Sequence, residues 1–189
     1  RAYWRYFSPG RPDAKGKKTS GVRAIRTATS HDFIHWDHQE DLSYGDAPPE
    51  HLYTNAIRRY DRSPGLFLGF PTRFQPKNQQ VEPVFMTSRD GVQFKRWPDA
   101  IIPIDAPQDR DGNRSNYMAR GLLQLPGDAK ELSVFATEAY YKGPASRVRR
   151  FVYRLDGFVS AQAKQGTLTT KPLTFAGSLT LPGETVNVD

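Results

Sequence analysis

The hydrophobic pattern of this chain is that of short β-strands. Apolar and polar residues alternate over many short segments, and glycine, proline and aspartate interrupt these segments at short intervals. Alternation of this kind places one face of each strand in a core. No segment keeps the period of an amphipathic helix, so the predicted fold class is all-β. Strands are expected at residues 2–8, 21–29, 34–42, 51–60, 65–74, 81–87, 93–97, 117–125, 131–141, 147–155 and 157–163.

Two short segments of the chain repeat one pattern. Residues 30–36 and 88–94 both contain a serine, an aspartate two positions later and an aromatic residue at the seventh position, at an offset of 58 residues. Serine and aspartate in this arrangement cap a tight turn between two strands. A degenerate third copy, Asp156-Gly157, lacks the serine. One such turn would indicate only a hairpin, whereas two matched copies and a third predict the repeated sheets of a β-propeller.

The texture of the sequence changes after Gln165. We therefore predict propeller sheets over residues 1–165 and the beginning of another β unit over residues 166–189. Because the chain opens on a strand without an initiator methionine and closes as another strand begins, we expect it to be part of a longer protein. The chain contains no cysteine, which excludes disulfides and thiolate metal sites. Neither a signal peptide nor an apolar run long enough to cross a bilayer is present, so no membrane partner is expected.

The net charge of +7 favours a polyanionic partner. Arginine supplies 18 of the 27 cationic residues. A nucleic acid, an anionic membrane or an acidic polysaccharide would fit, and an ordinary basic surface is the alternative. The arginines are spread through strand-like segments, and no helix-turn-helix, zinc-finger or RNP-type motif is present. We therefore expect no nucleic-acid partner.

The residues that could carry chemistry are mainly carboxylates. His31, His35 and His38 are spaced for a metal only if their segment were helical, and it reads as a hairpin, so we expect no metal and no cofactor. No serine elbow or phosphate-binding glycine loop is present. Glu138 ends an apolar strand next to aromatic residues. Partial burial there would raise its pKa, as a general acid requires, although simple alternation would also allow a solvent-facing glutamate. Asp61 either tunes such an acid or only holds its own turn.

Several polar residues lie in or beside apolar strands. Such residues either satisfy the core or point into a wet central channel, where arginine, asparagine and aromatic groups suit sugar hydroxyls and carboxylates. The candidate substrate-binding residues are Asn55, Arg58, Arg73, Arg114, Asn116, Tyr117 and Tyr140.

Longer segments of the chain resemble a known protein family. They are residues 3–7 (YWRYF), the Ser-x-Asp-x-x-x-Trp turn, residues 51–57 with 67–74, residues 149–160 (RRFVYRLDGFVS) and residues 166–175 (GTLTTKPLTF). These resemble bacterial glycosyl hydrolase-like proteins, five-bladed β-propellers of the arabinanase, levansucrase and invertase type. The resemblance implies a partial five-bladed propeller of about three blades, followed by the start of a β-sandwich. It also implies a secreted or periplasmic protein.

The same resemblance implies a glycoside hydrolase that acts on a polysaccharide or oligosaccharide through paired carboxylates, and the arginine content favours an acidic one. Its active site would lie at the axial end of the propeller, with Glu138 as the acid and Asp61 as the middle carboxylate. The carboxylate of the first blade is expected before Arg1. The sequence departs from the invertase pattern, because Asp61 follows Tyr60 rather than arginine and no proline follows it. A carbohydrate-binding propeller without catalysis is therefore the alternative.

Overall fold

The computed structural model describes residues 1–9, 21–106, 116–140, 143–160, 164–167, 169, 172, 178–181 and 184–187. The chain divides into two units, Arg1–Phe158 and Val159–Asp189, whereas the sequence predicted a boundary after residue 165. The prediction of an all-β fold is confirmed. Among the described residues, all pairs of named strands are antiparallel, and the one helical element is the 3₁₀ turn Gly143–Ala145.

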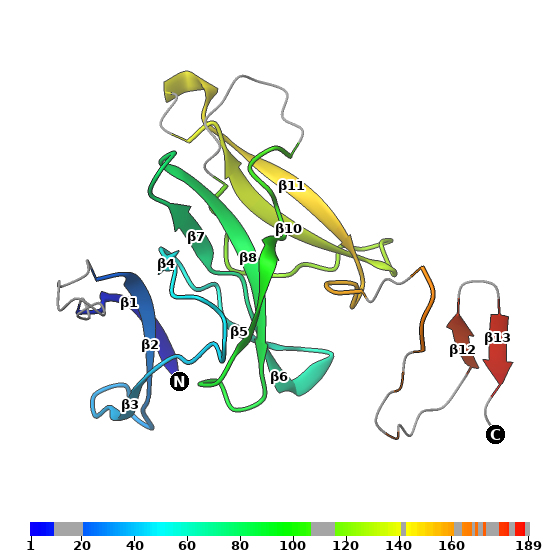
Figure 1. The fold of residues 1–189 in the computed structure, drawn as a ribbon, viewed down its shortest axis with the longest axis horizontal. Coiled ribbons are helices and arrows are strands. Elements are labelled where there is room, and N and C mark those ends of the chain that lie inside the picture. Colours follow the sequence, from blue (N-terminus) through cyan, green and yellow to red (C-terminus); the bar gives the residue numbers. More distant parts are fainter. Residues whose placement is uncertain are drawn as a thin grey trace. The chain divides into compact units, whose positions relative to one another are not determined.

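The first unit contains three sheets that follow one another along the chain (Figure 1). The first sheet has the order β1-β2-β3, with strands at Ala2–Phe7, Arg23–Thr29 and Asp37–Asp41. The third sheet pairs β10 (Glu131–Glu138) with β11 (Arg147–Arg154). The second unit contains the hairpin of β12 (Ser178–Leu181) and β13 (Glu184–Asn187).

The central sheet has the order β4-β7-β8-β6-β5, and β9 pairs with β8. Its strands are β4 (His51–Leu52), β5 (Arg58–Tyr60), β6 (Ser63–Gly69), β7 (Thr72–Gln75), β8 (Gln80–Ser88) and β9 (Lys95–Ala100). Strand β8 is buried along nearly its whole length. A strand without a polar face needs a covered surface on both sides, and this explains why residues 81–87 read as a nearly continuous apolar run.

Two hydrophobic clusters provide this cover. Met86 of β8 packs with Ile25 of the first sheet, and its neighbour Phe85 packs in a second cluster with Val134 of β10. Successive side chains of a strand point to opposite faces, so the first and third sheets contact opposite faces of the central one (Figure 1). Full burial of each of these apolar side chains contributes about 1.5–3 kcal/mol.

The two Ser-Asp turns predicted from the sequence have the same structure. In the first, the Ser30 hydroxyl accepts the backbone N–H of Phe33 at 2.8 Å, and Asp32 accepts those of Ile34 and His35 at 2.9 and 2.8 Å. In the second, Ser88 and Asp90 accept the three equivalent N–H groups at 2.8 Å each. The repeat that the spacing indicated is therefore a repeat of hydrogen bonds.

The third copy is a different turn. Asp156 itself has a positive φ of 59°, and its carboxylate accepts hydrogen bonds from Tyr60 and Arg62 instead of from its own turn. Without the serine, no hydroxyl is available to cap the backbone. The strand predicted at 157–163 is wrong for its described part, 157–160, which forms no strand.

Other strand predictions were too long. The predicted strand 51–60 is divided into β4 and β5, because the side-chain oxygen of Asn55 accepts the N–H of Ile57 and Ala56 takes a φ of 42°. The predicted strand 65–74 is interrupted at residues 70–71, where Pro71 offers no N–H. Residues 117–125 pair with β10 only through isolated bridges, of Met118 with Ala136 and of Leu123 with Ser133.

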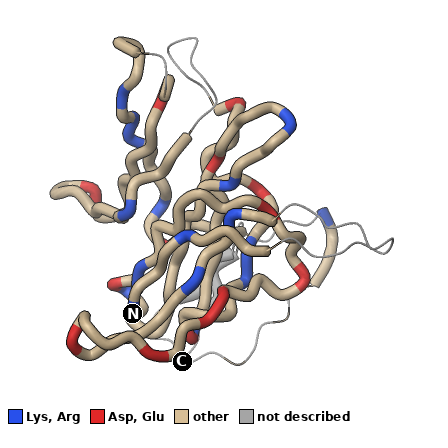
Figure 2. The backbone as a smooth tube through the Cα atoms, turned by 90° about the vertical axis from the view of Figure 1, so that its left-hand side faces the viewer, with Lys and Arg blue, Asp and Glu red and all other residues tan. Residues whose placement is uncertain are grey.

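The charges of the chain are widely distributed. Figure 2 shows lysine and arginine on many strands and turns instead of in a single segment. The described residues include no helix long and apolar enough to cross a membrane.

Candidate functional site

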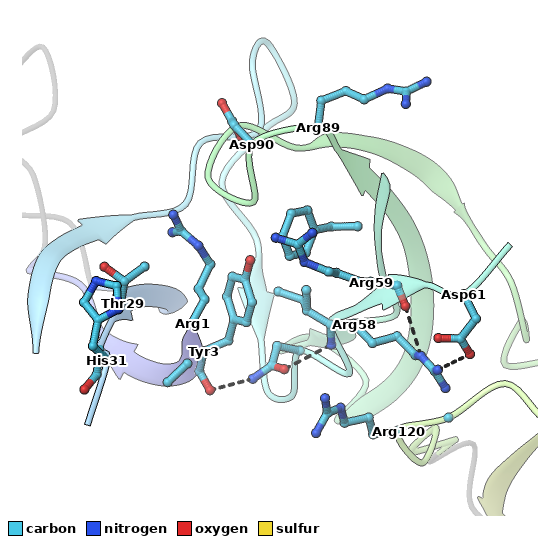
Figure 3. Close-up of a pocket in the computed structure, with 16 residues that line it drawn as sticks. Arg1, Tyr3, Thr29, His31, Arg58, Arg59, Asp61, Arg89, Asp90 and Arg120 are labelled. Atoms are coloured by element: carbon cyan, nitrogen blue, oxygen red, sulfur yellow. Dashed lines mark hydrogen bonds and ion pairs between the residues drawn. The ribbon is translucent and has the colours of Figure 1, made fainter. Parts of the chain in front are cut away.

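A cavity of about 1230 Å³ lies in the first unit, between one end of the first sheet and the central sheet (Figure 3). Both Ser-Asp turns contribute to its wall, together with β1, the segment 55–61 and residues 120–121. It is lined by Arg1, Ala2, Tyr3, Thr29, Ser30, His31, Asn55, Ile57, Arg58, Arg59, Asp61, Phe67, Arg89, Asp90, Arg120 and Gly121.

Three residues that the sequence singled out meet at this cavity. The Asn55 amide donates to the backbone oxygen of Tyr3 at 3.2 Å, which connects the two sheets below the cavity. Arg58 donates to the Asp61 carboxylate at 2.5 Å, and the Asp61 side chain is 78% exposed. Asp61 thus holds its own turn through Arg58, and it also presents carboxylate oxygens to the cavity.

The cavity has more guanidinium groups than carboxylates. Arg1, Arg59, Arg89 and Arg120 line it in addition to Arg58. Arg59 packs over the Phe67 ring, with 5.0 Å from its guanidinium carbon to the ring centre, and Arg1 donates to the Thr27 hydroxyl at 3.3 Å. Figure 3 shows Arg89 at the rim, directed away from Tyr3. No carboxylate of the described residues forms an ion pair with any of these four arginines.

Two other groups at the cavity have fixed protonation. Burial raises the pKa of Tyr3 to about 12, so its hydroxyl stays protonated and donates to the Gly91 carbonyl at 2.9 Å. Backbone N–H groups of its own turn, first that of Val92, lower the pKa of Asp90. Asp90 therefore remains an anion that is already bound by its turn.

Glu138 lies elsewhere and in a different state from the one expected. Its side chain is 1% exposed, and its carboxylate pairs with Arg147 and, at 2.7 Å, with Arg149. The hydrogen bond from Arg147 is the main cause that lowers the pKa of Glu138 from 4.5 to about 2. The expected rise of the pKa is wrong, because the charges of two arginines outweigh the effect of burial. In the described part of the chain, Glu138 does not line the cavity that Asp61 lines.

Arg73 belongs to a second, smaller cavity of about 600 Å³. It pairs there with Glu82 at 2.5 Å and Glu50 at 3.2 Å, and Glu50 also binds Arg96 at 2.9 Å. The side chains of Arg73 and Glu82 are 15% and 7% exposed. These residues form an internal ion-pair network that satisfies the core.

The remaining candidates lie outside the first cavity. Asn116 is 1% exposed and donates to the Pro103 carbonyl at 3.3 Å, so it satisfies the core. Tyr117 contacts Tyr140 edge to face, with ring centres 5.2 Å apart, and Tyr53 at 6.2 Å. Arg114 lies outside the described residues.

The histidines do not converge on a metal site. The described residues include no group of three or more His, Cys, Asp or Glu side chains that could hold a metal ion. His35 pairs with Asp32 at 2.6 Å within its turn, and His51 accepts the backbone N–H of Arg23 at 3.3 Å. His31 is at the wall of the large cavity.

No protein-family model matches the chain, and no curated protein matches it. The chain is similar to a solved structure described as a BT0996 RGII complex, with 12% sequence identity and a TM-score of 0.42. The match covers 79% of this chain and 45% of that one, so the chain spans less than half the length of that structure. The function is therefore argued from the cavity itself.

Sequence reasoning missed several cavity residues. Arg59 directly follows the candidate Arg58, but it reads as an ordinary strand cation. Arg1 and Arg120 come from segments far apart in the chain, and only the packing of the sheets brings them to one wall. One signal was available, because Arg120 precedes Gly121 and so marks a chain bend, where side chains often face a cavity.

Proposed function

We propose that the first unit binds a carbohydrate that carries carboxylate groups, in the cavity lined by Arg58 and Asp61. The observation that supports this proposal is the set of five arginines around one cavity that contains only two aspartates. Guanidinium groups bind carboxylates through paired, charge-assisted hydrogen bonds. The excess of positive charge therefore favours an anionic ligand.

The other lining groups favour a sugar over a polyphosphate. Thr29, Ser30 and Asn55 offer hydroxyl and amide groups at the wall, and Asp61 offers an exposed carboxylate. Sugar hydroxyls can donate to that carboxylate, whereas phosphate groups would be repelled by it. The volume of about 1230 Å³ exceeds that of most small-molecule sites, which supports an oligosaccharide ligand.

Binding is tested by calorimetry with oligogalacturonate as the acidic probe and a maltooligosaccharide as the neutral one. We expect the acidic probe to bind more tightly, and added salt to weaken its binding. Arg120→Ala should weaken it about tenfold, the effect of losing one charge-assisted hydrogen bond. Arg154→Ala is the control, since Arg154 is exposed and does not line the cavity. Equal binding of both probes, or an unchanged affinity of Arg120→Ala, contradicts the proposal.

Glycoside hydrolysis is a second candidate function. The observation that favours it is Asp61, whose exposed carboxylate faces the cavity where a sugar would bind. Paired carboxylates cleave glycosidic bonds when one donates a proton and the other activates water or attacks. Glu138 stays the predicted acid of this pair, although its two arginines keep it deprotonated at neutral pH.

Release of reducing ends from neutral and acidic glycans tests this second function. The hydrolase hypothesis predicts release by the wild type and its loss in Asp61→Asn and Glu138→Gln. If Glu138→Gln folds and cleaves at the wild-type rate, Glu138 is not the acid. If no glycan is cleaved while oligogalacturonate binds, the chain is a binding unit. A secreted or periplasmic location is part of the proposal, and fractionation of the producing cells checks it.

A further inference from the structure

The second Ser-Asp turn packs on the first sheet. Tyr3 of β1 donates its hydroxyl to the Gly91 carbonyl at 2.9 Å, and its ring contacts Phe94 edge to face at 6.4 Å. Phe94 is only 2% exposed. This turn is thus covered by the sheet that comes before its own sheet in the chain.

The corner after β11 packs in the same direction. Phe158 lies on the central sheet, with its ring centre 5.1 Å from that of Phe85 and 5.9 Å from that of Phe70. The Tyr60 hydroxyl donates to the neighbouring Asp156 carboxylate. Both contacts therefore join the corner of one sheet to the preceding sheet.

The first Ser-Asp turn has an apolar surface that is not covered within the described residues. Phe33 is 85% exposed, Ile34 is 76% exposed and Trp36, which corresponds to Phe94, is 41% exposed. Phe33 also has a φ of 64°, where the second turn has Gly91 with a φ of 78°. A left-handed conformation costs a residue with a side chain about 1–2 kcal/mol. A large apolar side chain that is both strained and exposed indicates a contact surface.

The third sheet has an apolar surface of its own. Val148 is 65% exposed and Val152 is 47% exposed, and both belong to β11. Residues four apart on a strand point to the same side. Phe151, on the opposite side of β11, packs against the hydrophobic cluster shared with the central sheet, so the valines face away from that sheet.

We propose that the first turn (Phe33, Ile34 and Trp36) docks on the third sheet (Val148 and Val152) of a second copy of this chain. The argument is continuity with the two internal contacts, both of which join a corner to the preceding sheet. In the first unit, the first turn is a corner without such a sheet, and the third sheet has a face without such a corner. The contact between copies is heterologous, so it joins copies head to tail.

Analytical ultracentrifugation of the wild-type chain at moderate salt, which screens its positive charge, is the first test. We expect the average mass to increase with concentration. The double variant Phe33→Gly/Ile34→Ser should associate about a hundredfold more weakly, because it removes two apolar side chains from the contact. Both side chains are exposed, and glycine suits the positive φ at position 33, so the variant should fold. Phe7→Ser is the matched control, since Phe7 is 60% exposed and belongs to neither surface.

A mixing experiment tests the direction of the contact. The turn variant keeps an intact third sheet, and Val148→Ser/Val152→Ser keeps an intact turn. A head-to-tail contact predicts that neither variant associates with itself and that an equal mixture forms a dimer and nothing larger. A wild type that stays monomeric at all concentrations overturns the proposal. So does a turn variant that associates like the wild type, or a mixture that forms no dimer.

Discussion

The ion pairs of Glu138 should stabilise the fold strongly and in a pH-dependent way. Its carboxylate is 1% exposed and is bound by Arg147 and Arg149. Lowering its pKa from 4.5 to about 2 corresponds to about 3 kcal/mol of folding free energy. Glu138→Gln preserves the shape of the side chain and removes the charge. We therefore expect this substitution to lower the free energy of unfolding at pH 7 by about 3 kcal/mol.

The sign of the pH dependence follows from the lowered pKa. Since the folded state binds the Glu138 proton more weakly than the unfolded state, this stabilisation is complete well above pH 4.5. It is lost as the pH falls toward 2. The difference in stability between the wild type and Glu138→Gln should therefore narrow across this range and be nearly absent at its lower end.

Urea unfolding followed by tryptophan fluorescence, at several values between pH 7 and the acid limit, measures this difference. Glu131→Gln is the control, because Glu131 lies at the other end of β10 and is exposed. It should change stability by less than about 0.5 kcal/mol. A Glu138→Gln variant as stable as this control at pH 7, or a difference that does not depend on pH, would refute the reasoning.

Three further predictions concern the turns. Gly91→Ala should lower stability by about 2 kcal/mol in the same urea assay, because the residue has a φ of 78° and an added Cβ would lie 2.6 Å from the Tyr3 hydroxyl oxygen. Gly45→Ala has a similar φ of 59° but no atom within 4 Å of its Cβ, so it should cost about 1 kcal/mol; equal losses at the two positions would contradict the packing of the second turn on β1. Phe33→Gly should raise the midpoint of thermal unfolding of the monomer by relieving a φ of 64°, and a lower midpoint would show that the Phe33 side chain supports its own turn.

The sequence determined those features that depend on local chemistry. Alternation and the absence of a helical period predicted strands, and Ser30, Asp32, Ser88 and Asp90 predicted two identical turns, because side-chain oxygens bind N–H groups only two or three residues away. Strand ends were harder to predict. The break between β4 and β5 depends on Asn55, whose amide also reaches the backbone oxygen of Tyr3 in another sheet.

Only the tertiary structure decided where the chemistry lies. The sequence could select Asn55, Arg58 and Asp61, but it could not bring Arg1 and Arg120 to the same cavity, because that proximity depends on how whole sheets pack. It also gave the wrong sign for the pKa of Glu138. A glutamate at the end of an apolar strand is expected to be stabilised in its neutral form. Register pairs that strand with β11, which places two guanidinium groups beside the carboxylate and keeps it charged.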